Sequence, residues 1–360
     1  MSSHPPDRQP SLCVIIPTLN EGKQLPSLLN QLLQQEAIDL EIIVADGGSD
    51  DDTVTLAARA GVSIIETASG RGRQMNGALS QCNAPYLLFL HADSVLTSRS
   101  QLSDALKTLQ QQIAAAGHQR IAGHFRLRFL RDNPGRNLAY RYYEEKSALN
   151  RMECTNGDQG FLMSQEFFNQ LGGFDESLWF LEDQRLAETI RLKGRWITLP
   201  GELQTSARRF EKEGLGRRMI LSALIMNFHQ IGFIEFFQRA GKVYRSQSET
   251  GPLQLSPIFQ LIDSLNREAK PGVARKRWVA TGHYVLGHAW QPFFYLDITL
   301  LYFFGFKKRL FLTLHDRIFK PLTNFVLFDY LTAGLVWLWF RASWLFFRYR
   351  EKVARSTPHA

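Results

Sequence analysis

The chain has 360 residues but only three cysteines. Cys13, Cys82 and Cys154 lie far apart, and no CxxC pair occurs. An odd number without such a pair indicates neither a disulfide framework nor a zinc knuckle, so we expect a reducing, cytoplasmic compartment. Residues 1–10 are polar and proline-containing, which is unlike a signal peptide and predicts a flexible N-terminus.

A glycine-rich GxGxxG turn is absent after the first apolar run, which disfavours a dinucleotide-dependent dehydrogenase. Hydrophobic residues make up 44% of the chain and charged residues 21%, which predicts a globular protein. The formal net charge of +8 is compatible with anionic partners such as nucleotide phosphates or an acidic membrane surface. We expect no nucleic-acid partner.

Short apolar runs alternate with segments of helical spacing through the first 90 residues. This alternation predicts an α/β fold, with a mostly parallel sheet covered by helices on both faces. The expected strands are Leu12–Ile16, Leu40–Ala45, Val62–Ile65 and Tyr86–Leu90, and the expected helices are Leu25–Leu33, Thr53–Ala60 and Gln74–Gln81. Further strands are expected at His124–Phe129 and Trp196–Leu199, and further helices at Asn137–Leu149 and from Leu181 to about Lys193.

Polar clusters follow three of these strands: Asn20-Glu21, Asp46 to Asp50, and His91 to Asp93. Ligands of such sheets bind beyond the carboxyl ends of the strands, so three successive clusters indicate a binding site. The alternative is that these are ordinary turn residues.

Four segments together resemble the family-2 glycosyltransferases of the GT-A fold. They are Ile15 to Glu21, Asp46 to Asp51, Phe89 to Asp93, and Gly172-Gly173-Phe174 leading to Glu182-Asp183. The resemblance covers about residues 11–235. A narrower similarity, to the subfamily labelled arsenosugar-biosynthesis glycosyltransferases, rests on Gly70 to Asn76, Leu90 to Asp93, Gly157 to Gly160 and Ser206 to Phe210.

The resemblance implies a nucleotide-diphosphate sugar of the UDP or GDP type as donor, and Mg²⁺ or Mn²⁺ as cofactor. Asp93 is then the metal-binding residue. The family usually has Asp-x-Asp where this chain has His91-Ala92-Asp93, so the role of His91 is open. His91 could hydrogen-bond a ribose hydroxyl or a phosphate, or it could simply bind backbone at the strand end.

The remaining donor contacts implied by the resemblance lie in the loops after the first three strands. Asp46 would accept a hydrogen bond from the base, with a turn or helix cap as the alternative. We expect the two arginines of the glycine-flanked loop to contact phosphate, unless that loop is merely solvated. The expected donor-binding residues are Pro17, Asn20, Glu21, Asp46, Gly48, Ser49, Arg71, Arg73, His91, Ala92 and Asp93.

The reaction also needs a base to take the proton of the acceptor hydroxyl. The resemblance implies Asp183, which would give direct displacement with inversion; the alternative is an acid that only favours a helix N-terminus. The acceptor or sugar pocket would include Asp158, Gln159, Gly160 and Glu182. Arg208 and Arg209 stand near the place of a Gln-x-x-Arg-Trp motif that they match imperfectly, and they imply at most a phosphate contact.

Residues 236–360 lie outside the resemblance, and we expect a helical, aromatic-rich, membrane-associated region. Val285–Phe306 and Leu322–Phe347 are long enough to span a bilayer, but each contains a charged residue, and basic clusters flank both. Basic groups on both sides favour helices lying at the cytoplasmic face of the cell membrane, peripheral or monotopic rather than integral. A soluble dimerisation or lid domain is the alternative.

The sequence therefore predicts transfer of a sugar from a nucleotide sugar to an acceptor hydroxyl, with a lipid or another hydrophobic molecule as the expected acceptor. A sugar-phosphate nucleotidyltransferase is disfavoured, because such enzymes carry a basic glycine-rich loop where this chain has Pro17 to Glu21. A catalytically decayed, membrane-associated scaffold is a third reading, suggested by His91.

Overall fold

The computed structural model describes residues 10–132, 135–178, 181–245 and 251–356. Its two compact units are Met1–Ser206 and Ala207–Ala360. The division falls before the predicted boundary at residue 235, because the last strand of the sheet ends at Ser206 and only helices are described after it. Most of the N-terminus that we expect to be flexible lies outside the described residues.

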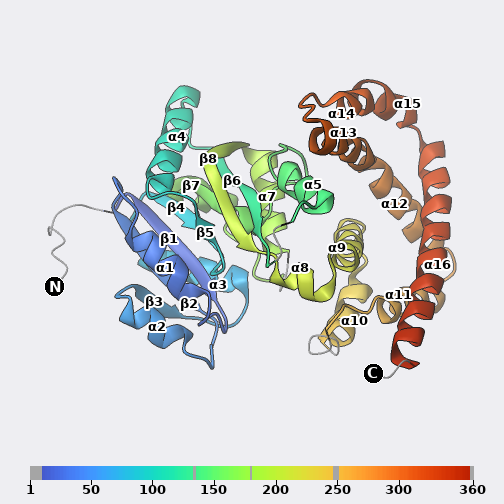
Figure 1. Ribbon diagram of the computed structural model, residues 1–360, viewed down its shortest axis with the longest axis horizontal. Coiled ribbons are helices and arrows are strands. Elements are labelled where there is room, and N and C mark those ends of the chain that lie inside the picture. Colours follow the sequence, from blue (N-terminus) through green and yellow to red (C-terminus); the bar gives the residue numbers. More distant parts are fainter. Residues whose placement is uncertain (1–9, 133–134, 179–180, 246–250, 357–360) are drawn as a thin grey trace. The chain divides into compact units, whose positions relative to one another are not determined.

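The first unit is built on an eight-stranded sheet with the order β3-β2-β1-β4-β7-β6-β8-β5 (Figure 1). The strands are β1 (Leu12–Thr18), β2 (Leu40–Asp46), β3 (Ser63–Glu66), β4 (Tyr86–Phe89), β5 (Val95–Leu96), β6 (Ile121–Leu130), β7 (Phe161–Ser164) and β8 (Arg195–Ser206). Strands β1 to β4 pair in parallel, and so do β6 and β8. β7 runs antiparallel to β4 and β6, and β5 antiparallel to β8. The predicted α/β sheet is confirmed, with a mixed half beyond β4.

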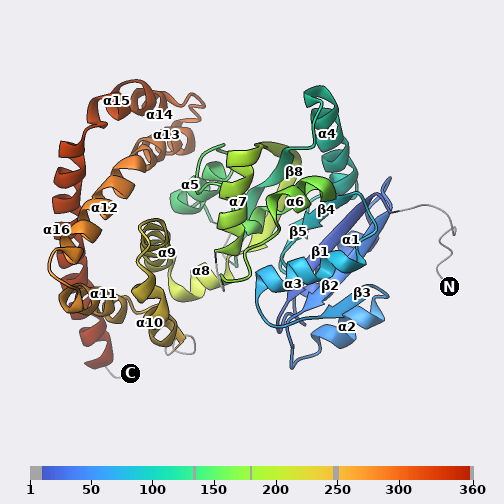
Figure 2. The same cartoon turned by 180° about the vertical axis from the view of Figure 1, so that it is seen from behind.

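Helices cover both faces of this sheet, as expected. Successive side chains of β1 alternate between two cores: Val14 packs in one, Ile15 in the other. The first core includes residues of α1 (Leu25–Leu33), α2 (Thr53–Arg59) and α4 (Gln101–Ala116). The second includes residues of α3 (Arg71–Ala78), α6 (Gln165–Leu171) and α7 (Glu182–Lys193), which Figure 2 shows in front of the sheet.

Two elements differ from their predicted extent. Helix α3 begins at Arg71, whereas the sequence indicated a loop up to Gln74. Gly72 is a poor helix former, but it packs closely here: an added Cβ would lie 3.4 Å from Phe174 and 3.6 Å from Glu182. β8 runs to Ser206, because pairing with β6 and β5 extends it past the predicted end at Leu199.

The expectation that the cysteines do not pair is wrong. Cys13 of β1 and Cys82, which follows the short 3₁₀ turn Leu79–Gln81, form a disulfide. The two cysteines are 69 residues apart in the sequence, so no local pattern indicates that they lie side by side. Cys154 is a buried free thiol.

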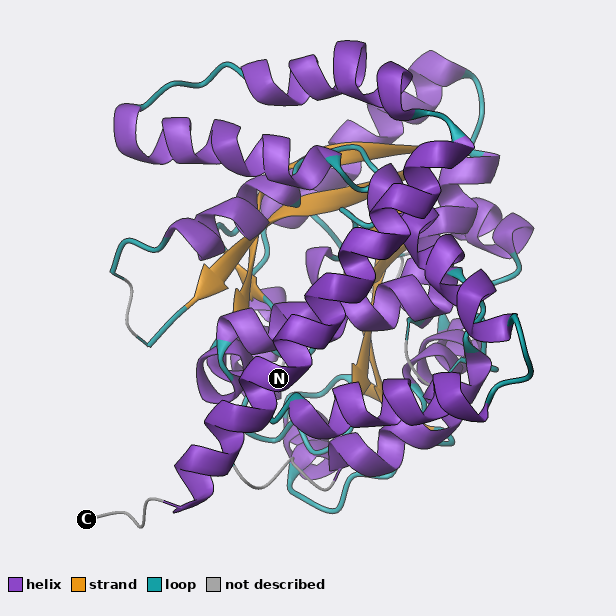
Figure 3. Ribbon diagram, turned by 90° about the vertical axis from the view of Figure 1, so that its right-hand side faces the viewer, coloured by secondary structure: helices purple, strands orange, loops and turns teal. Residues whose placement is uncertain are grey.

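The second unit is helical over its described residues; Figure 3 colours helices purple and strands orange. They are α8 (Arg208–Glu213), α9 (Leu215–Gln230), α10 (Ile234–Arg245), α11 (Ser256–Glu268), α12 (Val273–Gly287), α13 (Trp290–Phe304), α14 (Leu310–Leu314), the π-helical turn His315–Phe319, α15 (Lys320–Thr323) and α16 (Val326–Ser356). The unit has its own hydrophobic core, which includes Phe228 of α9, Phe259 of α11 and Phe340 of α16.

The two long apolar segments of the sequence are not single helices. Val285–Phe306 is divided between α12 and α13, and α15 and α16 meet at Asn324-Phe325. Among the described residues no single helix is long and apolar enough to cross a membrane. The pair Leu310–Thr323 and Val326–Val353 meets the length and composition only when taken together, and it is bent by 107°.

Candidate functional site

The loops after β1 and β2 are tied to each other by side-chain hydrogen bonds. The Asn20 N–H donates to Ser49 Oγ at 2.9 Å, and Asn20 Oδ1 accepts from the Asp50 N–H at 2.9 Å. The Glu21 N–H donates to Thr53 Oγ1 at 2.8 Å. The structure thus brings the predicted donor-binding residues of the two loops together at the carboxyl ends of adjacent parallel strands, and Pro17 lies buried in β1 just before them.

Asp46 is the organising residue of the second loop. Its Oδ1 accepts from Thr18 Oγ1 at 2.9 Å and Ser49 Oγ at 2.6 Å, and its Oδ2 accepts from the N–H groups of Gly48 and Ser49. Burial alone would raise the pKa of Asp46, but these hydrogen bonds outweigh it and hold the pKa below its ordinary value. Four bonds use the four acceptor positions of a carboxylate, which favours the turn-forming alternative over a contact with a nucleotide base.

Gln74 and Asn76, two residues of α3 that the sequence did not single out, hold the loops around the site. Gln74 is buried, and its amide nitrogen donates to the carbonyls of Thr18 at 2.7 Å and Ala45 at 2.8 Å, at the ends of β1 and β2. The Asn76 side chain bonds both the N–H and the C=O of Phe174. Both stand in the segment Gly70 to Asn76, where only the arginines suggested a function.

After β4, His91 lies against Asp158, with 3.1 Å between His91 Nδ1 and Asp158 Oδ1. Burial alone lowers the pKa of His91, but the hydrogen bond and charge of Asp158, together with the charge of Asp93, raise it above its ordinary value. Asp93 is half-buried, and its Oδ2 accepts from Thr205 Oγ1 of β8 at 3.2 Å. Ala92 between them is buried.

Asp183 approaches the same place from the first turn of α7. Its Oδ2 accepts from the Gly157 N–H and its Oδ1 from the Gln184 N–H, both at 2.8 Å. Gly157 separates Asp183 from His91: an added Cβ there would lie 3.0 Å from His91 Nε2 and 3.2 Å from Asp183 Oδ2. His91, Asp158 and Asp183 therefore lie around one glycine, which the sequence analysis did not name as a site residue.

Burial and neighbouring charges act on Glu182, the first residue of α7. Glu182 is buried, and burial with the adjacent charge of Asp183 raises its pKa above the ordinary value. Arg71 acts electrostatically on both Glu182 and His91, so the first turn of α3 belongs to this site. The stem of Arg73 instead lies near Gly70, whose added Cβ would be 3.8 Å away. Both arginines open a helix, which corrects the predicted loop.

Gln159 and Gly160 support the turn that carries Asp158, and their expected contact with a sugar stays a prediction. Gln159 is fully buried, and its amide nitrogen lies 2.9 Å from His124 Nδ1 and donates to the Ser147 carbonyl at 2.8 Å. Gly160 has φ 65°, and an added Cβ would lie 2.9 Å from the Leu90 side chain. Both residues fix the turn that carries Asp158.

Arg208 and Arg209 begin the second unit, in α8. The Arg209 guanidinium donates to Glu213 Oε1 at 3.1 Å and to the Tyr244 hydroxyl at 2.5 Å. Burial lowers the pKa of Arg209, but Tyr244 and Glu213 raise it above its ordinary value. Arg209 is thus bound within its own unit.

Part of the first unit is similar to a known protein family. Residues 13–172 match the model of glycosyl transferase family 2. Over 101 residues the chain is 34% identical to a PGL/p-HBAD biosynthesis glycosyltransferase of Mycobacterium bovis, a match covering 26% of this chain and 40% of that protein. Over 168 residues it is 27% identical to glycosyltransferase AglJ of Haloferax volcanii, covering 46% of this chain and 49% of that protein. The chain thus spans about half the length, or less, of these relatives.

A solved structure is similar over more of the chain. It is the mannosyltransferase PcManGT from Pyrobaculum calidifontis in complex with GDP-Man and Mn²⁺, 18% identical, with a TM-score of 0.47, covering 93% of this chain and 88% of that chain. The predicted base Asp183 lies outside residues 13–172. The residues that match the glycosyl transferase family 2 model include β1 to β4, His91 and Asp93.

Proposed function

We propose that the protein transfers a sugar from a UDP- or GDP-type nucleotide sugar to an acceptor hydroxyl, with inversion at the anomeric carbon. The observation that carries this proposal is the position of Asp183, which lies with His91 around Gly157 while Asp158 holds the His91 ring. Two N–H groups hold its carboxylate, which leaves acceptor positions for a substrate hydroxyl.

In this reaction the acceptor oxygen attacks the anomeric carbon while Asp183 takes its proton. The bond from that carbon to the diphosphate breaks, and the diphosphate leaves with the electron pair. The two N–H groups that donate to the Asp183 carboxylate fix its position at the start of α7, which suits Asp183 for the role of base. Arg71 adds positive charge on the side where the phosphates would lie.

The proposal includes a divalent cation, Mg²⁺ or Mn²⁺, held by Asp93. One carboxylate suffices for such ions when substrate phosphates supply further oxygen ligands, so a half-buried Asp93 fits the requirement. The ion would neutralise charge on the leaving diphosphate. His91, with Nδ1 held by Asp158, would place its ring beside the donor.

We also propose that the acceptor is a lipid or another hydrophobic molecule, and that the protein works at the cytoplasmic face of the cell membrane. Large exposed apolar side chains on α13 to α16 support this proposal. The narrower subfamily resemblance remains part of the proposal, supported by the segments Gly70 to Asn76 and Gly157 to Gly160.

A thermal-shift screen across nucleotide sugars, with and without Mn²⁺, tests the donor and the metal, because a specific ligand raises apparent stability. The variant Asp183→Asn should lose at least about 100-fold in kcat while still binding the nucleotide. Glu188→Gln, on the same helix α7, is the matched control and should stay active. Full turnover by Asp183→Asn would remove the base assignment, and absence of any nucleotide-sugar shift would remove the function.

A further inference from the structure

The outer face of α16 carries an apolar stripe that stays exposed among the residues that the structure describes. Six side chains form this outer stripe, and each is more than half exposed: Leu327, Leu331, Leu335, Leu338, Leu345 and Tyr349. Their spacings of three, four and seven residues place them along one side of a helix. Over 22 residues the stripe is about 33 Å long.

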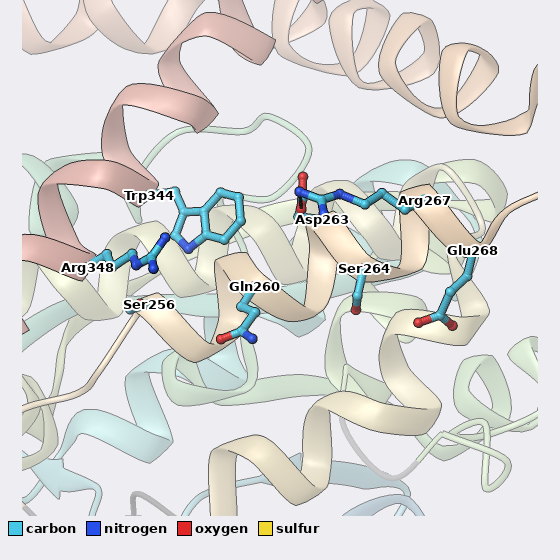
Figure 4. Close-up of a pocket in the computed structure, with 8 residues that line it drawn as sticks. All are labelled: Ser256, Gln260, Asp263, Ser264, Arg267, Glu268, Trp344 and Arg348. Atoms are coloured by element: carbon cyan, nitrogen blue, oxygen red, sulfur yellow. Dashed lines mark ion pairs between the residues drawn. The ribbon is translucent and has the colours of Figure 1, made fainter.

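The opposite face of α16 is fixed in the protein. Ala333, Phe340 and Phe347 are buried, and an added Cβ at Gly282 of α12 would lie 2.3 Å from the Asp329 carbonyl. Arg341 pairs with Asp263 of α11 at 3.1 Å, beside a cavity of about 560 Å³ between α11 and α16 (Figure 4). The side of α16 toward α11 is therefore packed against Phe259 and paired with Asp263, while the stripe faces away from the unit's core.

A second set of exposed apolar side chains lies on the bent arm that precedes α16. Phe303 and Phe304 end α13. Leu310 lies in α14, Ile318 in the π-helical turn and Leu322 in α15. Each of these side chains is more than half exposed. Exposed Lys307 and Lys308 stand among them. Soluble monomers rarely expose apolar patches of this extent, so the surface indicates a partner.

The charge of this region identifies the partner. Residues 290–360 contain ten basic and four acidic residues, which accounts for six of the eight net positive charges of the chain. The acids of α16 turn inward: Asp329 lies 3.1 Å from His283, and Glu351 accepts from the Leu255 N–H. An anionic lipid surface supplies the missing negative charge.

We propose that the outer stripe and the exposed arm Phe303–Leu322 form an interfacial docking surface for anionic membranes, with α16 lying in the plane of the headgroups. The inference rests on the proposed location at the membrane and gives that location a surface and a mode of attachment. Apolar side chains enter the acyl boundary, while the lysines contact lipid phosphates.

Sedimentation of the full-length protein with vesicles of phosphatidylcholine, with and without phosphatidylglycerol, tests the proposal. Binding should require phosphatidylglycerol and weaken in high salt. The triple variant Leu331→Gln/Leu338→Gln/Leu345→Gln should bind at least about 100-fold more weakly. Lys307→Gln and Lys308→Gln should each cost about fivefold.

Leu192→Gln is the matched control, because Leu192 is 88% exposed on α7 in the first unit. It should bind vesicles like the unmodified protein. Equal binding by the triple variant and this control would overturn the proposal. So would a light-scattering dimer that the triple variant converts to a monomer, or membrane attachment that resists a carbonate wash. Thermal shift with nucleotide sugar in the same samples reads the catalytic unit separately, so failure of the two proposals is distinguishable.

Discussion

At the scale of the residue, a side chain at Gly157 would be crowded, because an added Cβ would lie 3.0 Å from His91 Nε2 and 3.2 Å from Asp183 Oδ2. We predict that Gly157→Ala displaces Asp183 and lowers kcat by about 10- to 100-fold, with a smaller change in KM for the donor. Steady-state kinetics measures both. Gly216→Ala is the control, because an added Cβ there meets no atom within 4 Å, and it should leave kcat unchanged. Equal effects of the two substitutions would contradict the positioning role.

His124 predicts a pH dependence of stability. Burial lowers its pKa to about 4 from an ordinary value of 6.5, so the unfolded chain binds more protons between these values. The free energy of unfolding should therefore decrease by about 3 kcal/mol as the pH falls from 6.5 to 4. Urea titrations across this range measure it. His124→Gln should flatten the slope, whereas His118→Gln, at an exposed position, should keep it; identical slopes would exclude His124 as the cause.

Single residues also show what the sequence could predict of the site. The polar segments after β1, β2 and β4 were correctly predicted to follow strands of the sheet, because polar residues at the ends of buried apolar runs are visible in a sequence. The hydrogen-bonding of Asp46 and Gln159 was not visible there, because each bonds groups that are distant in the sequence or hidden in the backbone. The importance of Gly157 depends on its closeness to His91, earlier in the chain, and to Asp183, later in the chain.

At the scale of the element, the disulfide joins β1 to the turn before β4. Oxidised protein should be more stable than reduced protein by about 2–4 kcal/mol, because the link restricts the unfolded chain. Denaturant unfolding with and without dithiothreitol measures the difference. In Cys82→Ala the reductant should have no effect, and an unchanged response would refute the assignment of the link. The buried Cys154, whose pKa burial raises to about 11, should react slowly with alkylating reagents.

The elements were predictable to different degrees for physical reasons. Strands β1 and β2 are apolar in their buried parts up to Thr18 and Asp46, so their runs stand out in the sequence. The first turn of α3 does not stand out in the sequence, because Arg71 and Gly72 carry no apolar periodicity. Its position depends on the packing of Gly72 against Phe174. The antiparallel direction of β7 is likewise set by its neighbours in the sheet and by no local pattern.

At the scale of the whole molecule, each unit has its own hydrophobic core. The first unit packs helices on both faces of the sheet, and the second packs Phe228, Phe259 and Phe340 among helices. Separate cores predict separate unfolding events, because cooperativity depends on shared buried contacts. The proposed ligands also differ: the nucleotide-sugar site is built mainly from the first unit, and the lipid surface belongs to the second.

Calorimetry of the full-length protein should therefore show two transitions that respond to different ligands. A nucleotide sugar with Mn²⁺ at about 100 times its Kd should stabilise one transition by about 2.7 kcal/mol, and phosphatidylglycerol vesicles should shift the other. Asp93→Asn should remove the first response alone, and the triple leucine variant of the outer stripe the second alone. A single transition shifted by both ligands would contradict independent units. A nucleotide shift of both transitions, abolished by Arg208→Gln, would instead show that α8 takes part in holding the phosphates.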